Sequence, residues 1–130
     1  MTAYIRDADA IYRQSFAIIR AEADLRRFPA DLEKLAVRIA HASGMPAIVD
    51  DLRFSAGAGA AGRAALAGGA EILCDSATVA EGVTRTRLPA KNRVVFAPQS
   101  DPATTPQAAT VAGWRPLLAG AVVAIGADAT

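Results

Sequence analysis

The stretch EILCD at residues 71–75 decides the fold, because its consecutive apolar residues are typical of a short buried β-strand. Two further runs have the same character, RVVF at residues 93–96 and the β-branched run AVVAIG at residues 121–126. Helical segments of about ten residues separate such runs, with Asp75 or Ser76 placed to cap the first of them. This alternation predicts an α/β protein with a parallel sheet and crossover helices.

Two helices are expected before this sheet begins. The first is predicted over residues 8–25, where Asp7 and Asp9 can cap its start and apolar residues recur at helical spacing. The second is predicted over residues 29–44, because Pro29 suits a first turn and Gly44 ends it. The N-terminal part is therefore expected to be a helical lead-in to the sheet, and residues 1–130 are predicted to form a single domain.

The second helix carries one apolar stripe, which we expect to face the core. Its members recur at helical spacing: Leu32, Leu35, Ala36, Ile39 and Ala40. After it, residues 52–55 have the composition of a short strand, and residues 63–67 end a helix of small residues closed by two glycines. A loop rich in Ser, Thr and Pro is expected over residues 98–106.

The composition narrows the possible functions. Fourteen Lys and Arg residues against thirteen Asp and Glu leave the chain nearly neutral, so bulk charge gives no reason to expect nucleic acid or a membrane surface as a partner. No run approaches the roughly twenty apolar residues of a membrane span, and the N-terminus does not resemble a signal peptide. Cys74 is the only cysteine, which excludes an intramolecular disulfide and a thiolate metal site and is typical of a cytoplasmic protein.

The glycine-rich stretch GAGAAG at residues 57–62 matches the spacing G-x-G-x-x-G. A dinucleotide-binding loop of this kind follows a strand and opens a helix. Here the stretch precedes the buried strand at residues 71–75, so we do not expect a nucleotide site. A nucleotide-binding flavodoxin-like module stays open only as a third hypothesis.

His41 is the first candidate for chemistry. It is the only histidine, and histidine is the side-chain type that changes charge near neutral pH. Helical periodicity places it nearly opposite Leu35 and Ile39, outside the expected core, and in the last turn of its helix, where the helix dipole favours an imidazolium. A protonated imidazole can act as a general acid. The alternative is a solvated histidine at a helix end.

The second candidate is the stretch TRTR at residues 84–87, between a predicted helix and a strand. Its hydroxyls and guanidinium groups could bind carboxylates through charge-assisted, bidentate hydrogen bonds. The alternative is a solvated basic turn. Ser15, in the middle of the first helix, is by spacing alone a small residue that permits close packing.

These motifs coincide with those of one family. Five segments resemble the precorrin-8X methylmutases, which are called cobalt-precorrin-8 methylmutases in the anaerobic route, and they follow in that family's order and spacing. The segments are AIYRQSFAIIRAEADL at 10–25, AVRIAHASG at 36–44, ILCD at 72–75, GVTRTRLP at 82–89 and LAG followed by VVAIG at 118–126.

The resemblance implies a flavodoxin-like α/β/α domain that works as a homodimer. It implies an isomerase of cobalamin (corrin) biosynthesis that moves a methyl group from C11 to C12 of precorrin-8X, or of cobalt-precorrin-8, without a cofactor or a resident metal. The product is hydrogenobyrinate or its cobalt form. By the same resemblance, His41 protonates or hydrogen-bonds the macrocycle and Ser15 contacts it. The turn that binds the substrate from the neighbouring subunit would be formed by Thr84, Arg85 and Arg87.

Two departures from the family pattern change what we expect. The family carries a longer segment between Pro106 and Trp114, with an Asn-Thr-Arg motif whose role we do not transfer to Arg115. Its pattern also continues beyond Gly126, so we expect the sheet and the pocket to be incomplete at the C-terminus. The competing hypothesis is a non-catalytic tetrapyrrole-binding remnant of the family.

Overall fold

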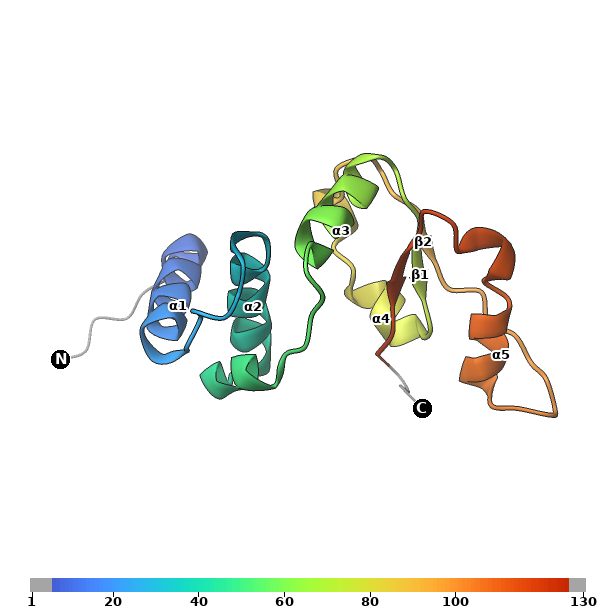
Figure 1. Cartoon of the computed structure of the whole chain (residues 1–130), viewed down its shortest axis with the longest axis horizontal. Coiled ribbons are helices and arrows are strands. Elements are labelled where there is room, and N and C mark those ends of the chain that lie inside the picture. Colours follow the sequence, from blue (N-terminus) through green and yellow to red (C-terminus); the bar gives the residue numbers. More distant parts are fainter. Residues whose placement is uncertain (1–5, 127–130) are drawn as a thin grey trace. The chain divides into compact units, whose positions relative to one another are not determined.

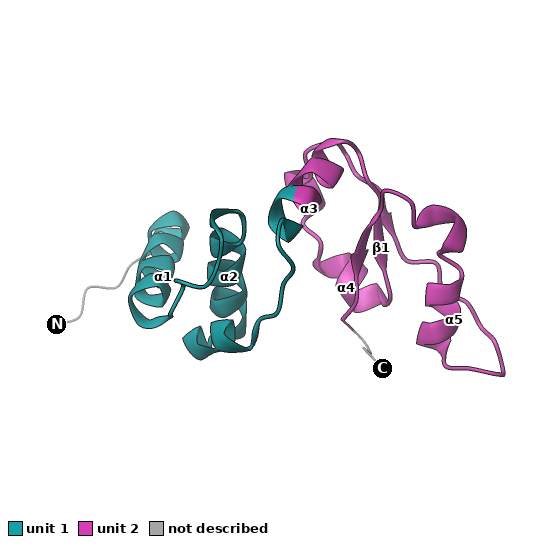
Figure 2. Ribbon diagram, in the orientation of Figure 1, with its two compact units in different colours: residues 1–60 teal, residues 61–130 magenta. Residues whose placement is uncertain are grey.

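The computed structural model describes residues 6–126, and the chain forms two compact units, residues 1–60 and 61–130 (Figure 2). The boundary falls within helix α3 (Ala58–Ala67). Helices make up the first unit and the second contains the sheet (Figure 1), so the predicted helical lead-in and parallel sheet are confirmed. The assignment of all 130 residues to one domain stays a prediction. No helix of the described part is long and apolar enough to cross a membrane.

Helix α1 (Ala8–Glu22) begins at the predicted cap, where the Asp7 carboxylate accepts a hydrogen bond from the Asp9 N–H at 3.3 Å. It ends at Glu22 rather than at residue 25. The reason is the carboxylate of Asp24, which accepts hydrogen bonds from the backbone N–H of Arg26 at 3.1 Å and from its guanidinium at 2.9 and 2.8 Å. This local turn competes with a further turn of helix.

Helix α2 (Ala30–Ser43) occupies the predicted range. Gly44 ends it in the left-handed conformation, with φ of +70°, which glycine adopts without the steric cost of a Cβ. The 3₁₀ helix η1 (Pro46–Asp51) follows directly and, like α1, packs against α2.

The core of unit 1 lies between α1, α2 and η1. The predicted stripe of α2 is confirmed at Leu32, Ala36 and Ala40 but not at Leu35. Leu35 is 52% exposed, whereas Val37 is 1% exposed. Both α1 and η1 pack against α2, and its buried face is centred on the smaller residues that follow Leu35, namely Ala36 and Val37. The buried members of this core are Ile19, Phe28, Leu32, Ala36, Val37, Ala40 and Val49.

The strand predicted over residues 52–55 is wrong, because this segment is an irregular loop. The guanidinium of Arg27 donates hydrogen bonds to the carbonyls of Val49 and Leu52, the second at 2.7 Å. The same guanidinium lies 4.4 Å from the centre of the Phe28 ring, which contacts Phe54. Arg27 thus binds one carbonyl of η1 and the carbonyl of Leu52, the first residue of the loop.

Unit 2 is built on three parallel strands in the order β2-β1-β3. Strand β1 (Ile72–Cys74) lies in the middle, flanked by β2 (Val94–Val95) and β3 (Val122–Ala124). Ile72 pairs with Val94 on one side and with Val122 on the other. All three strands fall within the predicted apolar runs.

The connections between these strands contain the remaining helices. Ser76 caps α4 (Ala77–Gly82), as predicted, and the 3₁₀ helix η2 (Arg85–Arg87) follows before β2. Between β2 and β3 lie α5 (Pro106–Ala112) and the 3₁₀ helix η3 (Arg115–Leu117). Helix α5 was not predicted, because it begins at the end of a segment rich in Ser, Thr and Pro.

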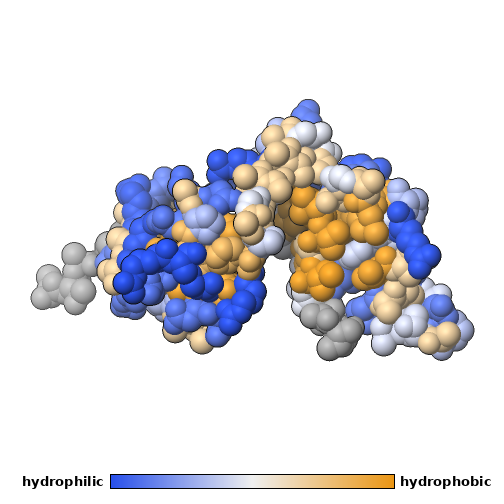
Figure 3. All heavy atoms as spheres, in the orientation of Figure 1, coloured by the Kyte–Doolittle hydropathy of each residue, from blue (hydrophilic) through white to orange (hydrophobic). Residues whose placement is uncertain are grey.

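Side chains of β1 are buried on both faces of the sheet, which explains its continuous apolar run. Ile72 and Cys74 pack in one cluster with Ala80 of α4, and Leu73 packs on the opposite face with Trp114. The neighbouring strand β3 is less covered, since Val123 is 42% exposed. Figure 3 shows hydrophobic residues gathered on one face of unit 2.

The glycine-rich stretch at residues 57–62 has a packing role at the start of α3. A Cβ placed on Gly59 would lie 2.4 Å from the carbonyl oxygen of Asp31, so only glycine fits there. The Asp31 carboxylate also accepts a hydrogen bond from the Ala60 N–H at 2.9 Å. Gly62, in the same helix, has open space around its α-carbon.

These two glycines give a matched test. Gly59→Ala should lower the free energy of unfolding by about 1–3 kcal/mol, because the added methyl group overpacks the contact with Asp31. Gly62→Ala should leave stability unchanged or raise it by about 0.4–1 kcal/mol, because alanine restricts the unfolded chain. Urea unfolding measures both. Equal stability of the two variants would contradict the close approach of α3 to Asp31.

Candidate functional site

The single histidine and Ser15 lie side by side in unit 1. Ser15 is on α1, His41 is in the last turn of α2, and the Ser15 Oγ lies 2.7 Å from the His41 Nδ1. The donor in this hydrogen bond depends on the state of the imidazole. A neutral Nδ1 without a proton accepts from the serine hydroxyl, and a protonated Nδ1 donates to it.

The position of His41 on α2 corrects the expectation that it lies away from the core. His41 follows Val37 by four residues, so the two share a face of the helix. Because the buried face is centred near Val37 and Ala40 rather than near Leu35 and Ile39, His41 lies at its edge and is half-buried. Its hydrogen bond to Ser15 also distinguishes it from a fully solvated side chain.

A hollow of about 320 Å³ opens beside this pair. Ile11 and Ile18 line it one turn to either side of Ser15, and each is 47% exposed. Pro46 adds a further apolar wall, so the polar side chains of the lining are few. An apolar hollow with a few fixed polar groups suits an organic ligand.

Two aromatic residues of α1 contact His41, and the sequence analysis missed both. The ring centre of Tyr12 lies 5.1 Å from that of His41, and the ring centre of Phe16 lies 5.3 Å from it. With Ser15 they occupy positions i, i+3 and i+4, one surface of a helix. The sequence contains that spacing, but it does not reveal that this surface of α1 faces His41 on α2.

The other predicted site residues, Thr84, Arg85 and Arg87, lie in unit 2. They stand at the end of α4 and in η2, and all three are exposed. Within residues 6–126, no ion pair engages either arginine. The structure thus brings Ser15 and His41 together in one unit and groups the three turn residues in the other.

Cys74 offers no nucleophile. It is fully buried in the middle of the sheet, and this burial raises the pKa of its thiol; Asp75 raises it further, while the charge of Arg85 acts in the opposite direction. In the part of the chain that the structure describes, no group of three or more His, Cys, Asp or Glu residues could hold a metal ion.

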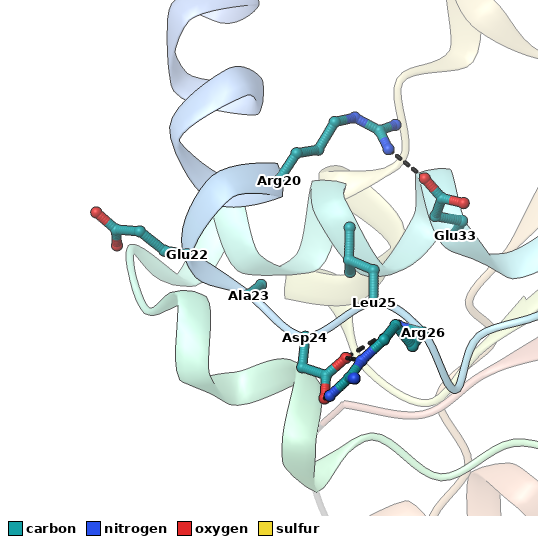
Figure 4. A pocket seen from close by; sticks show the side chains of 7 residues that line it. All are labelled: Arg20, Glu22, Ala23, Asp24, Leu25, Arg26 and Glu33. Atoms are coloured by element: carbon teal, nitrogen blue, oxygen red, sulfur yellow. Dashed lines mark hydrogen bonds and ion pairs between the residues drawn. The ribbon is translucent and has the colours of Figure 1, made fainter.

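A larger hollow of about 600 Å³ lies at the end of α1 (Figure 4). Four of its charged side chains form two pairs: Arg20 with Glu33, and Arg26 with Asp24 at 2.8 Å. The fifth, Glu22, points away from them (Figure 4). The hydrogen bonds from Arg26 hold the pKa of Asp24 well below its usual range. Because most of these charges are paired and no histidine lines this hollow, the smaller hollow at His41 is the better candidate site.

The contact between Ser15 and His41 can be tested directly. In Ser15→Ala, the imidazole loses the partner of its Nδ1, so its ¹⁵N and ¹H resonances should move toward those of a free histidine. These resonances are unambiguous because the chain has one histidine. Ser43→Ala is the control, since Ser43 lies in the same last turn and donates to the Ala40 carbonyl at 3.1 Å. Wild-type resonances in Ser15→Ala would contradict the contact.

Comparison with known proteins agrees with the geometry. The family model described as precorrin-8X methylmutase matches residues 10–130. A precorrin-8X methylmutase of Pseudomonas aeruginosa is 61% identical over 97% of this chain and 64% of its own length. One of a Sinorhizobium species is 50% identical over 95% of this chain and 62% of its own length.

A solved structure is also similar. It is the crystal structure of precorrin-8X methylmutase from Thermus thermophilus, with a TM-score of 0.80 and 34% sequence identity over 93% of this chain and 63% of that one. The chain therefore spans slightly less than two thirds of the length of each of these relatives. With a family model that covers nearly all of the sequence, the chain belongs to the precorrin-8X methylmutase family.

Proposed function

We propose that the chain acts as a precorrin-8X methylmutase, moving a methyl group from C11 to C12 of precorrin-8X or of its cobalt form to give the corresponding hydrogenobyrinate. The observation that carries the proposal is the 2.7 Å contact between Ser15 Oγ and His41 Nδ1 beside an apolar hollow. Family membership and the names of the relatives support it.

His41 is the proposed proton donor. While Nδ1 is engaged by Ser15, the other ring nitrogen, Nε2, has no hydrogen-bond partner within the described residues and is left for the substrate. In the imidazolium both nitrogens carry protons, so Nδ1 donates to the Ser15 Oγ and Nε2 donates to the macrocycle. The bond from the methyl carbon to C11 breaks as the bond to C12 forms. The proton that His41 donated then returns to the imidazole. The reaction is a rearrangement and consumes no cofactor.

The proposed substrate is a macrocycle with carboxylates at its periphery, so its binding site needs both apolar and cationic groups. Ile11 and Ile18 provide apolar contact beside His41, and Ser15 touches the substrate as well as the imidazole. The proposed carboxylate-binding groups are Thr84, Arg85 and Arg87. All three are exposed, and neither arginine forms an ion pair within residues 6–126, which supports this role.

The assembly and location of the protein belong to the same proposal. The protein would act as a homodimer in which the turn at residues 84–87 serves the site of the neighbouring subunit. Residues 1–130 would belong to a single domain, and the pathway would operate in the cytoplasm. The low net charge of +1 supports a small-molecule substrate rather than a nucleic acid.

The function is tested by adding purified protein to precorrin-8X and following the orange hydrogenobyrinate chromophore in a single turnover. His41→Ala should slow conversion by about 10²- to 10⁴-fold, the usual contribution of a general acid. Ser43→Ala should convert at the wild-type rate, because Ser43 donates to the Ala40 carbonyl and does not line the hollow. Unchanged conversion in His41→Ala would remove His41 from the mechanism. Binding by the wild-type protein without conversion would instead support the non-catalytic tetrapyrrole-binding function.

Arg85→Lys tests the proposed carboxylate contact. Lysine keeps the charge but not the planar fork, so substrate affinity should fall roughly tenfold if Arg85 binds a carboxylate in bidentate fashion. Arg63→Lys is the matched control, because Arg63 is an exposed arginine of unit 2 outside the turn. Equal affinity of Arg85→Lys and the wild type, measured by titration of precorrin-8X, would contradict the contact.

A further inference from the structure

The imidazole of His41 is held by more than its hydrogen bond. Phe16 meets it in an edge arrangement, with ring centres 5.3 Å apart and planes at 82°. Tyr12 meets it at 5.1 Å and 41°. Together with Ser15, these two rings surround the imidazole with three side chains from a single turn of α1.

Phe16 is the better fixed of the two rings. It packs against the core of unit 1, whereas Tyr12 is 49% exposed. The guanidinium of Arg38 lies over the Phe16 ring, 5.7 Å from its centre. Arg38 precedes His41 by three residues on α2, so α2 contacts Phe16 through Arg38 as well as through the imidazole.

Phe16 contacts the imidazole without lining the hollow that contains Ser15 and His41. A ligand in that hollow would therefore meet the histidine and the serine but not the phenylalanine. Phe16 would therefore contribute by orienting the imidazole rather than by contacting the ligand. Edge-to-face pairs prefer a defined geometry, because the positive edge of one ring meets the negative face of the other. Rotation of the imidazole about its Cβ–Cγ bond would lose this geometry and also move Nδ1 away from Ser15.

We propose that Phe16 is a positioning residue for His41. It holds the imidazole plane in the orientation in which Nδ1 meets Ser15, and so keeps Nε2 available for the substrate. The effect on conversion rests on the function proposed above, but the effect on the imidazole itself does not. The two can therefore be tested separately.

The experiment compares Phe16→Leu with Phe28→Leu. Both remove a ring from the same core, and Phe28 contacts Phe54 and Arg27 but not His41. At pH 8.5, where histidine is ordinarily neutral, the ¹⁵N shifts of the single histidine report the ratio of its tautomers. Phe16→Leu should shift this ratio, and the ring-proton resonances, toward those of a free histidine. Phe28→Leu should leave them at the wild-type values.

A wild-type tautomer ratio in folded Phe16→Leu would overturn the proposal. If that variant does not fold, as judged by circular dichroism, Phe16→Met retains more volume and flexibility and is measured in its place. In the conversion assay, kcat for the Phe16 variant should fall about tenfold while KM stays within twofold, because the acid is misoriented but the hollow is intact. A wild type that fails to convert precorrin-8X would reject the proposed function, and the resonance measurement would still decide the role of Phe16.

Discussion

The site depends on the close approach of α1 and α2. A serine hydroxyl lies only two bonds from its α-carbon, so Ser15 can reach His41 only if the two helix backbones are near each other. The buried face of α2 permits this, because Ala40, which lines the same hollow as Ser15 and Ile19 of α1, is 1% exposed and presents no more than a methyl group. Small side chains at a helix–helix contact reduce the distance between the axes. The packing of α2 and the position of His41 are therefore parts of one arrangement.

A hydrogen bond between distant residues likewise fixes the carboxyl end of the sheet in unit 2. The carboxylate of Asp75, at the end of β1, accepts a hydrogen bond from the N–H of Gly126 at 3.0 Å, which ties the end of β1 to the residues after β3. Ser76 then caps α4, and α4 leads into the arginine turn at Thr84. The turn thus follows directly on the elements that the end of β1 anchors.

Local signals predicted most of the helices and strands, since caps such as Asp7 and Ser76 and stops such as Gly44 act on their immediate neighbours. The early end of α1 came from the local bonds between Asp24 and Arg26, whereas the wrong strand at residues 52–55 came from contacts between residues far apart in the sequence. Arg27 binds carbonyls more than twenty residues away, and no local pattern in residues 52–55 reveals this. The buried face of α2 was misplaced because periodicity gave weight to the large residue Leu35 over its smaller neighbours. His41 and Ser15 were identified by family resemblance, and only the folded structure reveals that they touch.

The central claim is that α1 holds the imidazole of His41 through Ser15 and Phe16. Its most direct test is the nuclear Overhauser spectrum of the wild-type protein, in which the single histidine has no competing signals. The account predicts cross-peaks from the His41 ring protons to the β-protons of Ser15 and to the ring protons of Phe16. A His41 ring with random-coil shifts and no cross-peaks to either residue would contradict it.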